Sequence, residues 1–211
     1  MKTIENARNL LARIDEEVDG VKIDATERNR IAGALYDIAE DHGKAIVLLA
    51  ESSLYTSAFT LLRPLFETYI RAAWVHYCAS DDEIGKFISK DKIDVGISDM
   101  LSAIEQKKDF PETLSRIKSQ GLKAMHSYTH GGIFPVTRRL TEESIEPVFE
   151  EQEIDEVIRL TSVLSFLAFC GVVDMAKSEE KTQRLYELLK WIETWCFNQG
   201  MQRIAEEEGS R

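Results

Sequence analysis

The sequence predicts an all-α protein, a single helical bundle over residues 1–211 with about five long helices and short connecting helices. Only 11 glycines and four prolines interrupt the chain, which favours long helices. Apolar residues recur at spacings of three and four, and no alternating strand pattern or internal repeat occurs. The apolar and charged fractions, 44% and 30%, are typical of a soluble globular protein.

The first two helices follow from the apolar pattern of the N-terminal quarter. The first carries apolar residues at helical spacing, namely Ile4, Ala7, Leu11, Ile14 and Val18. It is expected to end near Gly20. Asp24 with Glu27 has the spacing of a capping box, so a long second helix is expected to follow, reaching about Ala50. Gly43 interrupts this helix and marks either a break or a close helix crossing.

The third helix is the most apolar segment of the chain. Ser53 is expected to cap it, and it is expected to run to about Ala79. Pro64 lies inside it, where proline removes one backbone hydrogen bond and kinks a helix. The carbonyl freed by the proline is therefore available to a functional site.

Short helices are expected next. Ser80 with Glu83 forms a capping box for the first of them. Pro111 suits the start of a longer one, which Gly131 and Gly132 would terminate. The expected ranges are Asp81–Ser89, Ser98–Lys107 and Glu112–Thr129, with a loop at Lys90–Val95. The segment Ile133–Pro147 is the least regular and is the expected mobile loop.

Two helices complete the predicted bundle, from about Glu151 to Lys177 and from about Lys181 to Glu207. The uncharged stretch Leu160–Val173 has 14 residues, which is too short to span a bilayer and predicts a core helix. No export signal is recognised at the N-terminus. We therefore expect a cytoplasmic protein without a membrane partner.

The charge and the cysteine content argue against several classes of protein and of metal site. The net charge of −11 disfavours broad, non-specific binding to nucleic acid, although a small basic pocket on an acidic body is compatible with it. The three cysteines, Cys78, Cys170 and Cys196, are far apart, which argues against a disulfide framework or a cysteine zinc site. Buried reduced thiols are the preferred interpretation.

The third helix carries a ladder of charges at Arg63, Glu67 and Arg71, spaced four residues apart on one arc. Because the rest of the segment is apolar on nearly every side, we expect the ladder to be buried. Burial of three charges is costly unless they pair with one another. The ladder is therefore either a structural ion network or the floor of a functional site.

Histidines give the second signal. His126 and His130 are four residues apart and share a helix face, followed by Gly131 and Gly132. Histidine titrates near neutral pH, so the pair suits proton transfer or metal binding. Capping of a helix C-terminus is an equally good interpretation. The His-Glu-x-x-His, Glu-x-x-His, glycine-rich phosphate-loop and Gly-x-Ser-x-Gly motifs are all missing from the sequence.

The spacing of Arg71 and His76 resembles the Arg-x4-His signature of the HEPN superfamily of prokaryotic defence and toxin proteins. Many HEPN members are metal-independent ribonucleases that dimerise to build one site. The resemblance implies that Arg71 binds phosphate and that His76 is the acid or base. Ala72 departs from the polar residue that often follows the arginine in that family. On a straight helix the two side chains point about 140° apart.

A longer run, from Ser57 to Trp74 together with His126–Gly132, resembles a bacterial all-helical family with an Arg-Pro-Leu-x-Glu helix and a His-Gly-Gly segment. This resemblance covers about the middle half of the chain and implies no established activity. It points to Arg63, Glu67, Arg71 and His130. We expect this family to be related to the HEPN superfamily.

Three functional hypotheses follow. The first is a metal-independent HEPN-like ribonuclease of a defence or toxin–antitoxin system. In this hypothesis Arg63 or Arg71 binds the phosphate, and Glu67 orients an arginine or the histidine. The proton-transfer group is His126, His130 or His76. It would act on RNA as a homodimer and need no cofactor.

The second is a non-catalytic module that dimerises or binds a protein partner or small ligand, with the ladder as a buried network that fixes helix register. The third is a three-histidine metal site made by His76, His126 and His130.

Arg138 and Arg139 are a surface pair that would reach an anion only from a loop. Trp74, Trp191 and Trp195 are expected in the core or a dimer interface.

Overall fold

A computed structural model describes residues 1–108 and 113–196. This part of the chain is all-α, with one isolated bridge between Leu140 and Ile145 as its only strand-like pairing. The predicted fold class is confirmed. The helices are α1 (Lys2–Val18), α2 (Glu27–Glu51), α3 (Tyr55–Tyr77), α4 (Asp81–Lys90), α5 (Ile97–Lys108), α6 (Thr113–Thr129), α7 (Ile133–Thr137), α8 (Glu151–Ala176) and α9 (Glu179–Cys196).

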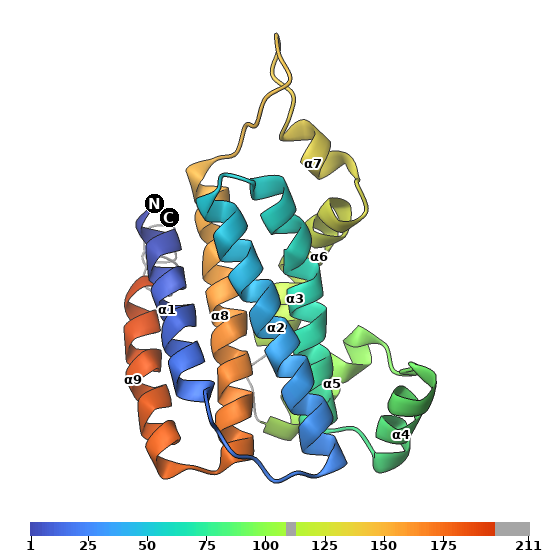
Figure 1. Cartoon of the computed structure of the whole chain (residues 1–211). Coiled ribbons are helices and arrows are strands. Elements are labelled where there is room, and N and C mark those ends of the chain that lie inside the picture. Colours follow the sequence, from blue (N-terminus) through green and yellow to red (C-terminus); the bar gives the residue numbers. More distant parts are fainter. Residues whose placement is uncertain (109–112, 197–211) are drawn as a thin grey trace, which may run out of the picture.

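The long helices α1, α2, α3, α8 and α9 run side by side along the bundle (Figure 1). Helix α3 contacts α2, α5, α6 and α8, and α8 contacts α1, α2, α3 and α9. Helices α4 and α5 lie beside the lower end of the bundle, and α7 lies at the upper end (Figure 1). This arrangement places α3 between α2 and α8 on one side and α5 and α6 on the other.

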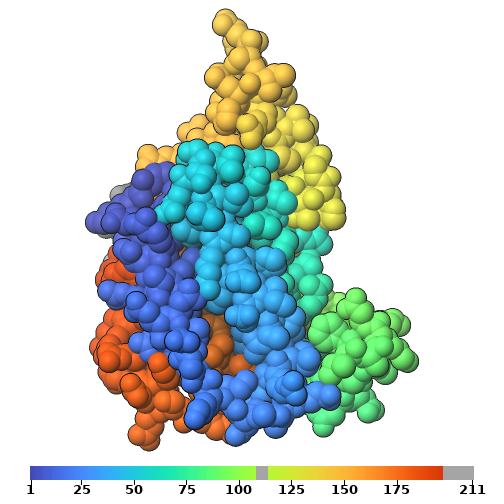
Figure 2. Space-filling view, in the orientation of Figure 1, coloured from blue at the N-terminus to red at the C-terminus, as the bar shows by residue number. Residues whose placement is uncertain are grey.

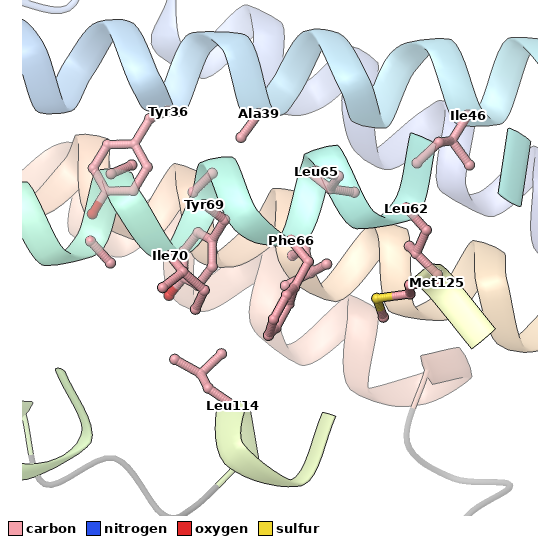
Figure 3. Packing of buried hydrophobic residues seen from close by; sticks show 14 of the residues in the cluster. Tyr36, Ala39, Ile46, Leu62, Leu65, Phe66, Tyr69, Ile70, Leu114 and Met125 are labelled. Atoms are coloured by element: carbon pink, nitrogen blue, oxygen red, sulfur yellow. The ribbon is translucent and has the colours of Figure 1, made fainter. Parts of the chain in front are cut away.

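The main core lies where α2 and α3 meet, with α6 closing it from the other side of α3 (Figure 3). Leu65, Phe66 and Ile70 of α3 are fully buried, as is Tyr36 of α2. A second cluster joins α1, α8 and α9 through Leu10, Ile14, Phe166, Phe169, Val173, Leu188 and Ile192. Trp74 is in the main core as expected, whereas Trp191 and Trp195 are partly buried against the second cluster.

Of three helix caps expected from the sequence, one is present in the structure and two are formed by other residues. The capping box of Ser80 and Glu83 is present. Asp24 is not the cap of α2, because the Thr26 hydroxyl accepts the Asn29 amide at 3.1 Å instead. Ser53 does not cap α3 either, since its φ of 59° places it in the left-handed turn before the helix.

Gly43 marks a close crossing and not a break, because α2 continues through it. A Cβ at this position would clash with Ser165 Oγ of α8. Helix α6 ends at Thr129 as expected, and its expected start at Pro111 lies outside the described residues. Helix α9 begins at Glu179, and its expected extension beyond Cys196 to Glu207 also lies outside them.

The segment expected to be a loop contains α7 and then a short hairpin, Arg138–Val148, which we call the arm. Backbone bonds run from Glu146 N to Arg139 O at 3.1 Å and from Val148 N to Arg138 O at 3.0 Å. Figure 2 shows the arm standing clear of the body. Its bridged pair, Leu140 and Ile145, is 52% and 83% exposed.

Helix α8 is the one described helix whose length and composition would also suit a membrane span. More than half of its most apolar window, 56%, is buried inside the bundle. A buried core helix has the same composition, as the sequence predicts for this segment.

The cysteines are free thiols, each half-buried. Burial raises the pKa of Cys170 and of Cys196 to about 12, so both stay protonated at neutral pH.

Candidate functional site

The charge ladder of α3 is formed as the spacing predicts. Arg63 Nε donates to Glu67 Oε1 at 2.6 Å, and Arg71 Nη2 donates to Glu67 Oε2 at 3.2 Å. The expected burial is wrong, because the three side chains are 25%, 19% and 36% exposed in chain order. The core contacts of α3 cover its other arcs, and the arc with the charges reaches solvent. A half-buried ladder remains open to a ligand.

Arg63 joins this ladder to both histidines of α6. Its Nη1 atom lies 2.5 Å from His126 Nδ1 and 3.3 Å from His130 Nε2. The two imidazole rings are 4.4 Å apart between centroids and inclined by 50°. One guanidinium nitrogen with two N–H groups therefore contacts two exposed imidazoles.

This geometry shows which ring nitrogen of each histidine accepts a hydrogen bond from Arg63. Arginine has only donors, so an imidazole nitrogen bonded to it must carry a lone pair. His126 then carries its proton on Nε2, and His130 carries its proton on Nδ1. Both of these N–H groups remain available to a ligand, as does the part of Arg71 not bonded to Glu67.

Pro64 leaves a backbone carbonyl of α3 free to bond to α6. Proline has no amide hydrogen, so the Thr60 carbonyl loses its intrahelical donor. The Thr129 hydroxyl donates to that carbonyl at 3.3 Å, shared with Met125 O at 2.9 Å. In return the Thr60 hydroxyl lies 3.3 Å from Tyr128 O. The freed carbonyl, expected to serve a site, positions the helix that carries the histidines.

The diglycine ends α6 directly after His130. Gly131 has a φ of 64°, which favours glycine, and Gly132 N donates to Ser127 O at 2.7 Å. The turn leaves His130 exposed at the last position before the chain reverses into α7. Helix termination and the histidine pair are therefore features of the same segment.

A basic stripe on α6 leads to the histidines, and the sequence reasoning missed it. Arg116, Ser119, Lys123, His126 and His130 are all exposed. Their spacing of three or four residues places them within about 80° on one helix face. Helix α6 holds Arg116, Lys118 and Lys123 and no acidic residue, although the whole chain has a net charge of −11. The seven-residue spacing of Arg116, Lys123 and His130 was the available signal in the sequence.

His76 lies elsewhere. It is thirteen residues beyond Arg63 on α3, a rise of about 19 Å. Its ring lies edge-on to Tyr36, with Nδ1 3.4 Å from the phenol oxygen, and its Nε2 is 3.8 Å from Asp174 Oδ2. Arg71 and His76 have different partners within one chain, in keeping with the angle of about 140° expected between them on a straight helix.

The three-histidine metal site is not formed either. His76 is far from His126 and His130, and the described residues contain no group of three histidine, cysteine or acidic side chains able to hold a metal ion. Arg63 also occupies the ring nitrogens of the remaining pair that face α3. A fixed guanidinium at this position repels a cation.

Arg138 and Arg139 hold the base of the arm. Arg138 pairs with Glu153 at the start of α8, and Arg139 Nη2 donates to Thr56 Oγ1 at 3.2 Å. Both guanidinium groups have structural partners. They are not part of the site on α3 and α6.

Comparison with known proteins places the site within a family. The sequence model of a family described as a family of unknown function (DUF6988) matches residues 36–195, which contain the ladder, the histidine pair and the arm. No curated protein and no solved structure matches the chain.

Proposed function

The chain belongs to the family of unknown function DUF6988, and from this premise we propose that it is a metal-independent ribonuclease whose site is built by Arg63, Glu67, Arg71, His126 and His130. One observation carries the proposal, namely the contact of Arg63 Nη1 with both exposed imidazoles. A fixed cation beside two proton-transfer groups is the combination that phosphodiester cleavage needs.

The proposed reaction uses the 2′-hydroxyl of RNA as nucleophile. One imidazole takes the 2′-hydroxyl proton, the 2′-oxygen bonds to phosphorus, and the bond from phosphorus to the 5′-oxygen breaks. The other ring, which takes up a proton from solvent to become an imidazolium once Arg63 has turned to the phosphate, gives that proton to the leaving oxygen. The products are a 2′,3′-cyclic phosphate and a 5′-hydroxyl, and no metal ion is required.

Arg63 would couple phosphate binding to base formation. In the free protein its N–H groups point at the lone pairs of both rings. A phosphate oxygen that draws one of these N–H groups away exposes an imidazole lone pair, which is then able to accept the 2′-hydroxyl proton. Glu67 keeps Arg63 oriented through the 2.6 Å bond, and Arg71 offers a second cation to the phosphate.

The basic stripe of α6 supports an extended anionic substrate. Phosphate groups along a single strand would meet Arg116 and Lys123 before they reach the histidines. The acidic remainder of the protein would disfavour long, non-specific contacts with nucleic acid. The proposal therefore favours a short or structured RNA over bulk nucleic acid.

The test is cleavage of a labelled RNA by purified untagged protein in EDTA, with end-group analysis. We expect cyclic phosphate ends from the wild type and at least a hundredfold loss for His130→Ala, His126→Ala and Arg63→Ala, since positioned acid–base groups contribute about that much or more. His42→Ala, on α2, is the matched control and should retain activity. Intact RNA with the wild type, or equal rates for the control and site variants, would refute the ribonuclease.

The relation to the HEPN superfamily and a role in a bacterial defence or toxin–antitoxin system are parts of the same proposal. In this chain the histidines would come from α6, and His76 of the Arg-x4-His spacing would serve only if a second chain supplied it. A homodimer in the cytoplasm is the expected setting.

A second candidate is a dimerising or partner-binding module, and the exposed arm favours it. Leu140 and Ile145 form one apolar face, because bridged residues of an antiparallel pair point to the same side. Light scattering on size-exclusion fractions tests self-association. We expect Ile145→Lys to reduce the mass of a homodimer to that of a monomer, with Leu48→Lys, an exposed apolar residue of α2, as control.

A further inference from the structure

A pocket lies between α1, α2 and α8, apart from the site on α3 and α6. Its volume is about 200 Å³. Its walls are mostly apolar and include Ile14, Val18, Ile23, Phe169, Val172 and Met175. None of these residues belongs to the site on α3 and α6.

Glu40 of α2 is part of the wall of this pocket. It is only 7% exposed, and neither carboxyl oxygen has a hydrogen-bond partner among the described residues. In the described part of the chain, the Ser165 hydroxyl of α8 is the one neighbouring neutral donor close enough to favour the ionised carboxyl, and it too is buried without a hydrogen-bond partner of regular geometry. A buried carboxyl that is left unpaired costs stability, so its retention in an apolar wall points to a ligand that supplies the missing donor.

The charges around the pocket indicate the sign of that ligand. Asp15 and Asp37 line it with Glu40, and Lys44 is the one cation among its lining residues. Lys44 is already paired with Asp15, at 2.5 Å between Nζ and Oδ1. The remaining charge is negative, so a cation is favoured and an anion is repelled.

We propose that this pocket binds a small primary ammonium compound with an aliphatic body, whose ammonium group pairs with Glu40. A body of about six carbons suits the volume, since a cavity of about 150 Å³ holds benzene. The terminal torsion of glutamate is broad, which lets the carboxyl turn toward an incoming donor. This function is independent of the ribonuclease site.

Binding would be coupled to proton release. Burial raises the pKa of Glu40 to about 8, opposed by Lys44 and reinforced by Asp15 and Asp37. These groups, with Ser165 of α8, are the polar neighbours that α1, α2 and α8 present to it. At about pH 6.5 the carboxyl is mostly neutral and must lose its proton to pair with an ammonium group. The affinity should therefore rise by roughly tenfold or more between about pH 6.5 and about pH 8.5.

The experiment is calorimetric titration of the full chain with hexylamine at about pH 8.5, with 1-hexanol and hexanoate as comparators of equal length. We expect hexylamine to bind at least tenfold more tightly than 1-hexanol, and hexanoate not to bind. Glu40→Gln should weaken hexylamine binding at least tenfold. Asp41→Asn, which removes a charge from an exposed neighbour outside the pocket, should leave it unchanged.

A second variant keeps Glu40 and fills the cavity. Gly33 lines the pocket and has room for a Cβ, whose nearest neighbours would be Ile23 Cδ1 at 3.6 Å and Met175 Cε at 3.8 Å. Gly33→Leu should abolish hexylamine binding while the RNA-cleavage assay is unaffected. Equal binding by the wild type, Glu40→Gln and Gly33→Leu would overturn the proposal. So would no binding up to about 10 mM at either pH.

Discussion

The ring of Tyr36 on α2 packs directly against the backbone of Gly171 on α8. A Cβ at Gly171 would lie 2.5 Å from both Cε2 and the phenol oxygen of Tyr36. Tyr36 is 1% exposed and cannot move away easily. The absence of a side chain at Gly171 is therefore what allows α2 and α8 to approach each other at this point.

Gly171→Ala is expected to destabilise the fold by about 1–3 kcal/mol, because the added methyl group overpacks a filled core. Gly85→Ala on α4 is the matched control, since nothing lies within 4 Å of its added Cβ. There the usual helix preference for alanine should raise stability by about 0.5–1 kcal/mol. Urea unfolding of both variants measures the difference, and two shifts of the same sign would contradict the packing argument.

Thr129→Val is expected to lower stability by about 1 kcal/mol, because the Thr60 carbonyl would lose the donor that replaces the missing amide of Pro64. The same loss should be smaller in a Pro64→Ala background, where the new backbone amide at this position is able to donate to that carbonyl. A double-mutant cycle in urea measures this coupling. Thr182→Val on α9 is the control, because its hydroxyl bonds to the nearby Ser178 carbonyl and to no other helix. Additive changes across the cycle would exclude the proposed link.

Much of the fold is predictable from the sequence because apolar periodicity alone defines long helices. The sequence also places the charge ladder on one face of its helix and His126 with His130 on one face of another, but their juxtaposition was a hypothesis, because neither pattern shows which helices pack together; the contacts of Arg63 show it. The prediction that Ser53 caps α3 was wrong because the backbone of Ser53 is left-handed in the turn before the helix. The capping preference of serine gives no indication of such a turn.

The expected burial of the charge ladder was wrong for a different reason. An apolar helix is predicted to be buried on all sides, and only the positions of its neighbours show which arc reaches solvent. The pocket around Glu40 is likewise formed by three helices that are distant in sequence. Nothing in the local pattern of α2 brings Asp15 and Phe169 beside that carboxyl.

Stability is expected to fall as pH rises from about 4.5 to about 8 through Glu40. Burial raises its pKa from 4.5 to about 8, so in this window the native state holds a proton that the unfolded chain has lost. Below the window both states are protonated, and above it both are ionised and the stabilising effect of the native proton is gone. Glu40→Gln should remove this dependence.

Thermal unfolding of the wild type and Glu40→Gln, without added ligand, measures this contribution. The two proteins should have similar midpoints near about pH 5, and the variant should be the more stable one near about pH 8.5 by an amount on the order of a few kcal/mol. Asp41→Asn is again the control for loss of an acidic side chain from α2. Parallel curves for the wild type and Glu40→Gln would mean that the carboxyl titrates normally.

RNA affinity is expected to depend on the basic stripe of α6 through counterion release. Arg116→Gln and Lys123→Gln should each reduce the slope of log affinity against log salt by about 0.7, the value for one contact with a single strand. Lys86→Gln and Arg30→Gln remove exposed cations from α4 and α2 and should leave the slope unchanged. The measurement is fluorescence anisotropy with an RNA whose 2′-hydroxyl groups are methylated, so that binding is observed without cleavage. Equal slopes for stripe and control variants would place the RNA elsewhere on the protein, because a phosphate that passes along α6 to His126 cannot avoid both cations.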